Sequence, residues 1–472
     1  MVNGLSGERM LAGLAIGIIL LIFMVLKTKI QAFLALLIAT VIVGVIGGMP
    51  LTNITYETAD GAKKTLGILH SITAGFGGTL GSIGIIIGFG VMMGQIFEAT
   101  GAAKRMALTF LHLFGKGKEE EALAFTGFLV SIPIFCDSGF IVLAPIAKAL
   151  SRVTKKSVVG LGVSLAAGLV ITHSLVPPTP GPLGVCGIFG VDVGVYILMS
   201  IALALPMTVA CIAYSRLSLS KKYYWLLDDA DQIKPETYRE PDYNAAFHMD
   251  MTAVPGTFES FAPLLVPIVL ILINTIATAM KLTGGVMSYL IFFGQPIIAV
   301  GLGLVLAIFT LGTRLDRKTA LLEMEKGMAS AGIIMLVTGG GGALGQIIKD
   351  SGLGSYMADG LAAASIPLVI LPLVISTAMR FIQGSGTVAM TTAASISAPI
   401  LNAAGVNPLL GVIACCVGSL FFGYFNDSYF WVVNRTLGVS EAKDQLRIWS
   451  ITSTIAWAVG VAEIVILSLF MR

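Results

Sequence analysis

Two polar segments that contain glycine and proline interrupt sequence that is otherwise apolar enough to lie in a lipid bilayer. The first is Ser131-Ile-Pro-Ile-Phe-Cys-Asp-Ser-Gly-Phe140, and the second is His173-Ser-Leu-Val-Pro-Pro-Thr-Pro-Gly-Pro182. Hydrocarbon offers no water to unpaired amides, so irregular backbone at that depth is tolerated only where protein or a wet cavity surrounds it. An acid such as Asp137 is costly there and by default marks a path for substrate, ions or protons. These segments predict a carrier with a binding site near the middle of the membrane.

The composition agrees with a polytopic membrane protein. The 472 residues are 56% hydrophobic and 12% charged, whereas about a quarter of an ordinary globular chain is charged. The net charge of +3, carried by scattered basic residues, excludes a nucleic-acid-binding protein. The five cysteines lie in apolar segments without the spacing of a metal site, so they are interpreted as packing residues, and we expect no cofactor and no metal. The apolar run Met10 to Leu26 is interpreted as a retained first helix rather than a signal peptide.

Hydropathy predicts an all-α chain with many membrane spans, since roughly 20 apolar residues cross a bilayer as a helix. The predicted spans are 10–26, 30–48, 78–98, 158–190 (interrupted), 194–214, 259–280, 286–312, 328–349, 408–434 (interrupted) and 447–470. Two further apolar stretches, 123–151 and 366–400, are broken in the middle. Each of these two has the length of a pair of half-depth helices, so we expect re-entrant hairpins.

The charges of the loops orient the chain. Lys27, Lys116 and Arg152 are examples of basic residues that follow predicted spans, and more open the long loop that begins at residue 215. The positive-inside rule assigns these loops to the cytoplasm. Both termini then lie outside. Hairpin 123–151 opens toward the cytoplasm, and hairpin 366–400 enters from the outside.

Short motifs recur in the two halves of the chain in the same order. Gly94-Gln95-Ile96 is echoed by Gly345-Gln346-Ile347, and Asp137-Ser138-Gly139 is paralleled by Gly384-Ser385-Gly386. A predicted hairpin and an interrupted span follow in both halves. We therefore expect two inverted repeats, 1–214 and 258–472, joined by a cytoplasmic linker loop at 215–257. Inverted repeats characterise secondary transporters, whose sites form where discontinuous helices meet.

Half-helices are expected to begin near the middle of the membrane after Gly139, Gly184, Gly386 and about Asp427. Each presents unpaired N–H groups and the positive end of a helix dipole, which suits a carboxylate. Nearby hydroxyl and amide groups suit a hydroxylated anion, although Ser and Thr in membrane helices more often stabilise kinks or bond a neighbouring helix. The candidate substrate-binding residues are Ser138, Gly139, Thr179, Ser385, Gly386, Thr387, Asn426 and Ser428.

Three ionisable residues are candidates for proton coupling. Asp137 at the first hairpin tip is the strongest, with helix capping as its structural alternative. Asp427 is second, and His173 can titrate near neutral pH or serve only as a hydrogen-bonding group. Arg380 could pair with the substrate or with Asp427. Charged residues at span ends, namely Glu98, Lys349 and Asp350, are interpreted as snorkelling side chains.

Three motifs are distinctive: Ile134-Phe-Cys-Asp-Ser-Gly-Phe-Ile-Val-Leu143, the segment from His173 to Pro182, and Phe425-Asn-Asp-Ser-Tyr-Phe-Trp-Val-Val-Asn434. They resemble motifs of the gluconate:proton symporter family, within the wider ion-transporter superfamily, and the resemblance covers nearly the whole chain. The resemblance implies uptake of a sugar acid such as gluconate across the cytoplasmic membrane, driven by protons. It also implies a scaffold domain that forms a homodimer and a mobile transport domain. The family also includes carriers of D-serine and other small hydroxylated acids.

Two other classes of function compete with a carrier. A channel needs a continuous pore lined by rings of carbonyl or charged groups, which two broken hairpins do not supply. An intramembrane hydrolase would need His173, Asp137 and Ser138 in the geometry of a nucleophile, a base and an orienting group. The inverted repeat counts against both, so the chain is not expected to be an enzyme. The sequence leaves open which acid is carried and whether sodium replaces the proton.

Overall fold

The structure, a computed structural model, describes residues 5–57, 63–227, 233–238, 254–282, 284–354, 356–357, 367–424 and 427–471. Most of these residues are helical, which confirms the predicted helical class. Two short antiparallel strand pairs were not expected: β1 (Ile54–Glu57) pairs with β2 (Lys63–Leu66), and β3 (Trp225–Leu227) pairs with β4 (Ile233–Pro235). Ile54 lies opposite Leu66 in the first pair, and Trp225 lies opposite Pro235 in the second.

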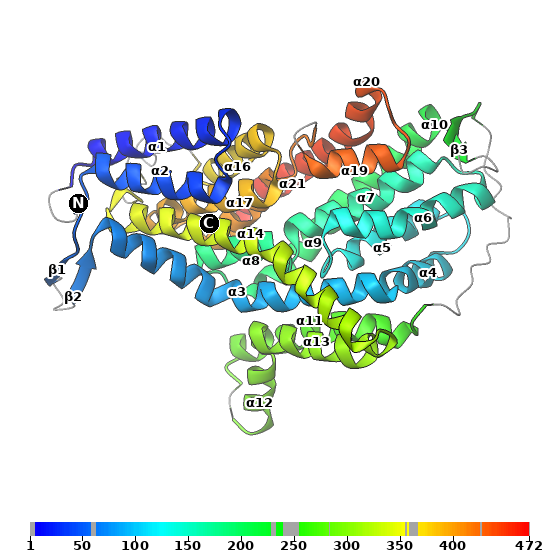
Figure 1. Ribbon diagram of the computed structural model, residues 1–472, viewed down its shortest axis with the longest axis horizontal. Coiled ribbons are helices and arrows are strands. Elements are labelled where there is room, and N and C mark those ends of the chain that lie inside the picture. The colour runs from blue at the N-terminus through cyan, green and yellow to red at the C-terminus, as the bar shows by residue number, and fades with distance from the viewer. Residues whose placement is uncertain are drawn as a thin grey trace.

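Two long helices, α3 (Ile68–Thr100) and α14 (Arg317–Asp350), pack along each other through the centre of the fold (Figure 1). At one end α2 packs against α14 and α1 packs on α2. The helices α4 to α7 gather at the other end, and α11 to α13 form a layer along one flank. The bounds of the peripheral helices are α1 Gly7–Lys27, α2 Ala32–Gly47, α4 Ala102–Phe114, α11 Thr257–Ala279, α12 Val286–Phe293 and α13 Pro296–Thr310.

Four pairs of shorter helices, each joined by non-helical residues, lie in the stretches expected to be broken. The two hairpins are α5 (Glu119–Val130) with α6 (Cys136–Thr154), and α16 (Ile370–Gln383) with α17 (Gly386–Ala403). The two interrupted helices are α7 (Val158–Leu175) with α8 (Pro180–Phe189), and α18 (Pro408–Gly418) with α19 (Ser428–Thr436). The helices α9 (Val193–Tyr214), α20 (Ala442–Gln445) and α21 (Ile451–Phe470) complete this part of the fold.

Glycines let the first hairpin pack closely on the helix that follows it. A Cβ atom added to Gly168 of α7 would lie 2.0 Å from the carbonyl oxygen of Ala124, and one added to Gly127 of α5 would lie 2.5 Å from that of Leu165. Side chains at these positions would force α5 and α7 apart. Small residues at such crossings are how membrane helices gain van der Waals contact without a hydrophobic driving force.

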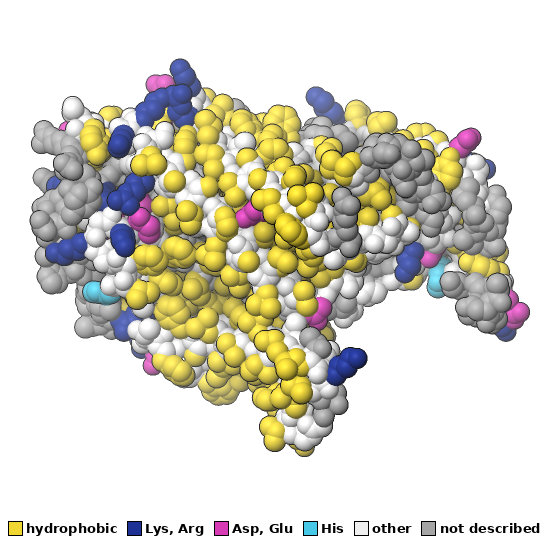
Figure 2. Space-filling model, turned by 180° about the vertical axis from the view of Figure 1, so that it is seen from behind, with side chains coloured by type: hydrophobic (Ala, Val, Ile, Leu, Met, Phe, Trp, Pro, Cys, Tyr) yellow, Lys and Arg dark blue, Asp and Glu magenta, His cyan; other side chains and the backbone are white. Residues whose placement is uncertain are grey.

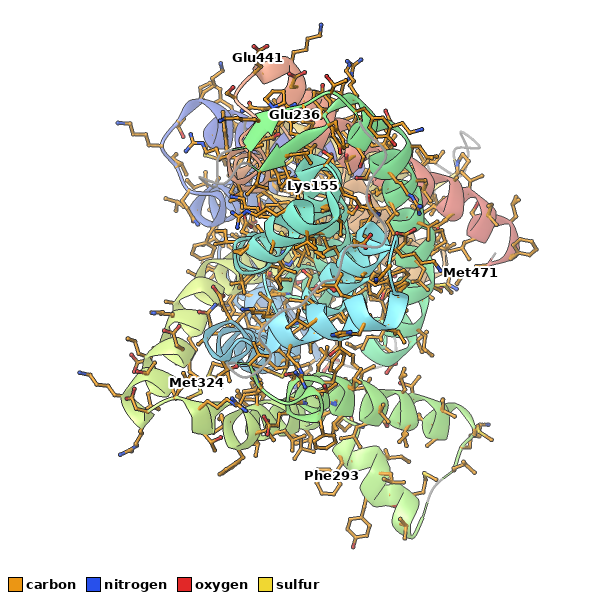
Figure 3. All side chains as sticks on the ribbon, turned by 90° about the vertical axis from the view of Figure 1, so that its right-hand side faces the viewer. Lys155, Glu236, Phe293, Met324, Glu441 and Met471 are labelled. Atoms are coloured by element: carbon orange, nitrogen blue, oxygen red, sulfur yellow. The ribbon has the colours of Figure 1, made fainter. Side chains whose placement is uncertain are left out.

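Two expected elements differ from the structure. The span predicted at 286–312 is two helices, α12 and α13, because Gly294 ends the first and Pro296 begins the second, where its missing N–H is not needed. Figure 3 shows α12, with Phe293 labelled, projecting from the body of the protein. The linker predicted from residue 215 begins later, because helix α9 continues as a π-helical turn and the short α10 (Ser220–Lys222).

Several helices are long and apolar enough to cross a membrane. Among the described residues there are 5 such helices, or up to 6 if the bent pair Ile68–Gly81 and Gly84–Thr100 is one span. Figure 2 shows apolar side chains across the middle of one face, with Lys and Arg side chains gathered toward the end that carries α10 and β3. That end holds several of the loops that the positive-inside rule assigns to the cytoplasm, such as those after α4 and α6, but not the loop after α1.

Candidate functional site

The tip of the first hairpin brings Asp137 to the beginning of a helix. The turn between α5 and α6 is closed by the Ser131 hydroxyl, which donates to the Ile134 carbonyl at 3.2 Å. Gly94 of α3 lies directly against this tip, since a Cβ atom there would come within 2.2 Å of the Pro133 carbonyl oxygen. Helix α6 then starts at Cys136, which places Asp137 in its first turn.

The tip of the second hairpin is shaped by Gly384 and Ser385. Gly384 ends α16 with a φ of 82°, in the left-handed region that favours glycine. Ser385 caps α17, and its hydroxyl oxygen accepts a hydrogen bond from the Val388 amide at 3.4 Å. The first turn of α17 therefore begins at Gly386, with Thr387 beside it.

Each interrupted helix resumes with a polar residue at its cap. Thr179 precedes α8, and its hydroxyl donates to the Val176 carbonyl at 2.6 Å inside the break. Asp427 precedes α19, and its Oδ1 accepts from the Tyr429 amide at 3.1 Å. The half-helices thus begin at Cys136, Pro180, Gly386 and Ser428, so the expected starts after Gly139 and Gly184 were wrong, whereas those at Gly386 and about Asp427 are confirmed.

These breaks meet around one cavity of about 390 Å³, here called the central cavity. Three helix N-termini line it, from α6, α17 and α19, together with the last turn of α7 and Arg380 of α16. Unpaired amides and the positive end of the helix dipole make such N-termini favourable for anions. The polar or charged residues on its wall are Asp137, His173, Ser174, Arg380, Ser385, Thr387, Ser419, Asp427, Ser428 and Tyr429.

The charges in the central cavity form one complete pair and one acid without a cation. Arg380 Nη2 lies 2.5 Å from Asp427 Oδ2, and both side chains are buried. Asp137 is held instead by Ser428, whose hydroxyl donates to Asp137 Oδ1 at 3.2 Å. Within the described residues Asp137 has no basic partner. With His173 neutral, the cavity therefore carries one net negative charge when Asp137 is ionised.

Two buried nitrogen atoms on the cavity wall have no hydrogen-bond partner among the described residues. They are Nε of Arg380 and Nδ1 of His173. The His173 ring lies against Phe135, with the ring centroids 5.6 Å apart. Buried polar atoms are normally paired by protein or ordered water, so both nitrogen atoms are candidates to contact a bound molecule.

The structure gathers most of the predicted site residues but not all of them. The wall of the central cavity includes Asp137, His173, Ser385, Gly386, Thr387, Asp427 and Ser428. Thr179 lines a small adjoining cavity that shares Phe135 and His173 with the central one. Gly139 packs on α7, where an added Cβ would lie 2.8 Å from Leu169. Asn426 and the side chain of Ser138 lie outside the described residues.

Other wall residues were missed as site residues. Ser174 follows His173 directly, Ser419 follows the end of α18, and Tyr429 lies in the first turn of α19. Their nearness to the predicted breaks could have identified them as site residues. No group of three or more His, Cys, Asp or Glu side chains is placed to hold a metal ion in the part of the chain that the structure describes.

Comparison with known proteins gives a consistent set of relatives. A family model described as GntP family permease matches residues 9–470. An uncharacterized permease of Haemophilus influenzae is 45% identical, over 97% of this chain and 92% of its own length. A high-affinity gluconate transporter of Escherichia coli is 32% identical, over 96% of this chain and 98% of its own. The solved YdaH transporter of Alcanivorax borkumensis shares the fold, with a TM-score of 0.60 at 16% identity, over 95% of this chain and 98% of that one.

Proposed function

Since the chain belongs to the GntP family of permeases, we propose that it is a secondary transporter that imports a sugar acid such as gluconate with protons across the cytoplasmic membrane. Its apolar helices and permease relatives make it a multi-pass membrane transporter of a small molecule. The central cavity is the proposed substrate site. Its volume of about 390 Å³ falls in the range of small-molecule pockets.

The observation that carries the proposal is the net negative charge of the central cavity when Asp137 is ionised. Arg380 is already paired with Asp427, so Asp137 and a substrate carboxylate would face each other without a spare cation. Two like charges in a site of low dielectric repel strongly. A proton on Asp137 removes that repulsion, so anion and proton bind best together. In a symporter, this mutual dependence couples transport of the anion to transport of the proton.

The rest of the cavity suits the hydroxyl groups of a sugar acid. Three helix N-termini can receive the carboxylate without a free arginine. The hydroxyl group of Thr387 and the unpaired nitrogen of His173 lie on the same wall. The hydroxyl groups of Ser419 and Ser428 donate to the Cys416 carbonyl and to Asp137, and their oxygen atoms can still accept from a substrate hydroxyl. Buried polar groups of a site are left unsatisfied by an analogue that lacks the matching hydroxyls, which is the physical origin of discrimination.

A competition assay tests this substrate class. Uptake of labelled gluconate into proteoliposomes should be inhibited by unlabelled gluconate and barely by a monocarboxylate without hydroxyl groups. Thr387→Val should weaken apparent gluconate affinity by about 1–3 kcal/mol if its hydroxyl contacts substrate, whereas Thr278→Val on the flanking α11 should not. Equal competition by the hydroxyl-free acid would reduce the proposal to a general anion carrier. Uptake of labelled D-serine without uptake of labelled gluconate would instead indicate that another hydroxylated carboxylate is the substrate.

The proposal includes two inverted repeats and hairpins that open on opposite sides. Lys118 precedes α5 and Asn402 lies near the end of α17, and both are exposed. The five native cysteines are buried, so an impermeant maleimide should report mainly an introduced cysteine. Lys118→Cys should react only from the cytoplasmic side and Asn402→Cys only from the outside. Labelling of both from one side would contradict the inverted arrangement.

A further inference from the structure

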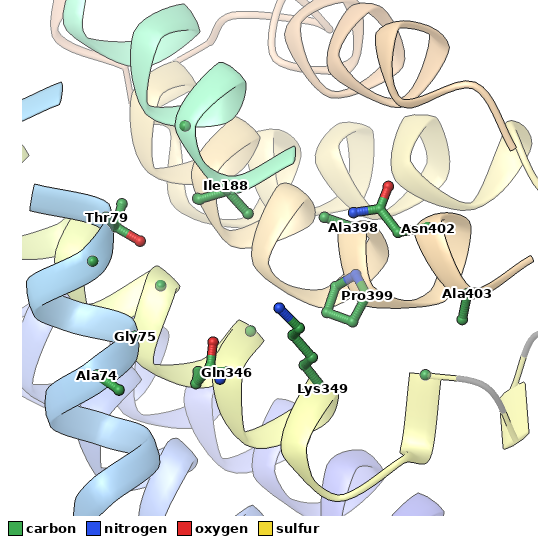
Figure 4. Close-up of a pocket in the computed structure, with 15 residues that line it drawn as sticks. Ala74, Gly75, Thr79, Ile188, Gln346, Lys349, Ala398, Pro399, Asn402 and Ala403 are labelled. Carbon is green, nitrogen blue, oxygen red and sulfur yellow. The ribbon is translucent and has the colours of Figure 1, made fainter. Parts of the chain in front are cut away.

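A second cavity, of about 410 Å³, lies between α3, α8, α14 and α17 and shares no residue with the central cavity. Its wall includes Gly75, Gly78 and Thr79 of α3, Gln346 and Lys349 of α14, and Asn402 of α17. Figure 4 shows the Lys349 side chain reaching toward the middle of this space, with Gln346 and Asn402 at its sides. The Lys349 side chain is exposed, so its interpretation as a snorkelling side chain stays a prediction.

The ammonium group of Lys349 has no counter-ion within the described residues, although an acid follows it in sequence. Both carboxylate oxygens of Asp350 are engaged elsewhere. Oδ2 accepts from the Ser71 hydroxyl at 2.6 Å, and Oδ1 accepts from Gln346 Nε2 at 2.8 Å. Asp350 at the end of α14 is therefore bonded to Ser71 of α3 and to Gln346 of α14 rather than to Lys349. Among the described residues, the second cavity therefore holds an exposed cation without an ion-pair partner.

Glycine residues shape the boundary of the second cavity. A Cβ atom on Gly342 would lie 2.1 Å from the Thr79 hydroxyl oxygen, so α3 and α14 touch through glycine on this side. A Cβ atom on Gly78 would instead meet nothing within 4 Å, which places Gly78 at open space. The cavity thus combines a lysine, two amide side chains and a volume similar to that of the central cavity.

The two cavities lie at opposite ends of the same helix. Gly386, Thr387 and Val388 at the start of α17 line the central cavity, whereas Ala398 and Asn402 near its end line the second. With a rise of 1.5 Å per residue, Thr387 and Asn402 are roughly 20 Å apart along the axis. By the positive-inside rule the Asn402 end faces outside.

We propose that the second cavity is an outer anion site, at which Lys349 binds the carboxylate of a sugar acid before the acid reaches the central cavity. Gln346 and Asn402 then face the hydroxyl groups. The identity of the anion rests on the proposed function, whereas the location of the site rests on the geometry of the second cavity. A cation near the mouth of a transport path raises the local concentration of an anionic substrate.

The first test is the concentration dependence of gluconate uptake. Lys349→Gln should raise the apparent KM about tenfold while the maximal rate changes little, as expected for loss of a charged hydrogen bond. Lys349→Arg should stay close to wild type. Lys63→Gln removes an exposed lysine of β2 that is not on the cavity wall, and should have no effect. An unchanged KM in Lys349→Gln would overturn the outer site while leaving the transport function intact.

A second test needs no transport and so separates the two proposals. In Asn402→Cys, an anionic methanethiosulfonate should react several-fold faster than a cationic one of similar size, and Lys349→Gln should abolish that preference. Gly78→Leu should slow both reagents by filling the cavity, whereas Gly77→Leu, also in open space but not on its wall, should not. Equal reaction rates for the two reagents with Lys349 present would show that the cavity does not select anions.

Discussion

Arg380→Ala is expected to abolish uptake and to destabilise the protein, because it leaves Asp427 as a buried, unpaired charge. The pair is short, at 2.5 Å, and the two side chains are only 7% and 8% exposed. Removing one partner of such a pair typically costs about 3–5 kcal/mol. The effect should appear both as lost transport in proteoliposomes and as a lower unfolding temperature in detergent.

Two further variants separate the structural from the functional effect. Arg216→Ala breaks the ion pair with Glu121, in which the side chains are 44% and 22% exposed, and should cost less than about 1 kcal/mol. Arg380→Gln combined with Asp427→Asn removes both charges, so it should recover most of the stability but not the uptake. Wild-type uptake by Arg380→Ala would show that the pair is not part of the transport site.

Asp137→Asn is expected to abolish uptake driven by a pH gradient while preserving exchange of substrate across the membrane. The amide keeps the shape of the carboxyl group, and its oxygen can still accept from the Ser428 hydroxyl. It cannot take up and release a proton. The variant should therefore behave permanently as the protonated form, which binds the anion but cannot be driven by the gradient.

Counterflow of labelled gluconate distinguishes this result from misfolding. Asp137→Asn should show counterflow comparable to wild type but no accumulation. Asp192→Asn is the matched control, because Asp192 caps α9, away from the cavity, and an asparagine can accept the same Val195 amide bond. Accumulation by Asp137→Asn under a pH gradient would transfer the coupling role to Asp427 or His173.

The positions of the chain breaks could be predicted because their causes are local. Proline and polar residues inside apolar stretches prevent a continuous helix, and all four stretches are broken in the structure. The residue at which each helix resumes depends on its neighbours. Gly139 lies inside α6, where its amide donates to the Phe135 carbonyl at 2.9 Å, and Pro180 begins α8 because the first turn needs no N–H bond.

The partners within the site could be suggested but not decided from the sequence. Arg380 and Asp427 are 47 residues apart, and Asp137 and Ser428 are 291 apart, so only tertiary packing shows which groups meet. The same holds for Lys349. Its place near a span end favours snorkelling, and only the structure shows that Asp350 bonds Ser71 and Gln346 while Lys349 has no ion-pair partner among the described residues.

Gluconate uptake by the purified wild-type protein in proteoliposomes, with and without an imposed pH gradient, tests the central proposal most directly. With the outside acidic, labelled gluconate should accumulate above its external concentration, and a protonophore should abolish the accumulation. A sodium gradient alone should have no effect. Accumulation that follows sodium but ignores the pH gradient, or absence of gluconate uptake under any gradient, would contradict the proposed proton-coupled transport of a sugar acid.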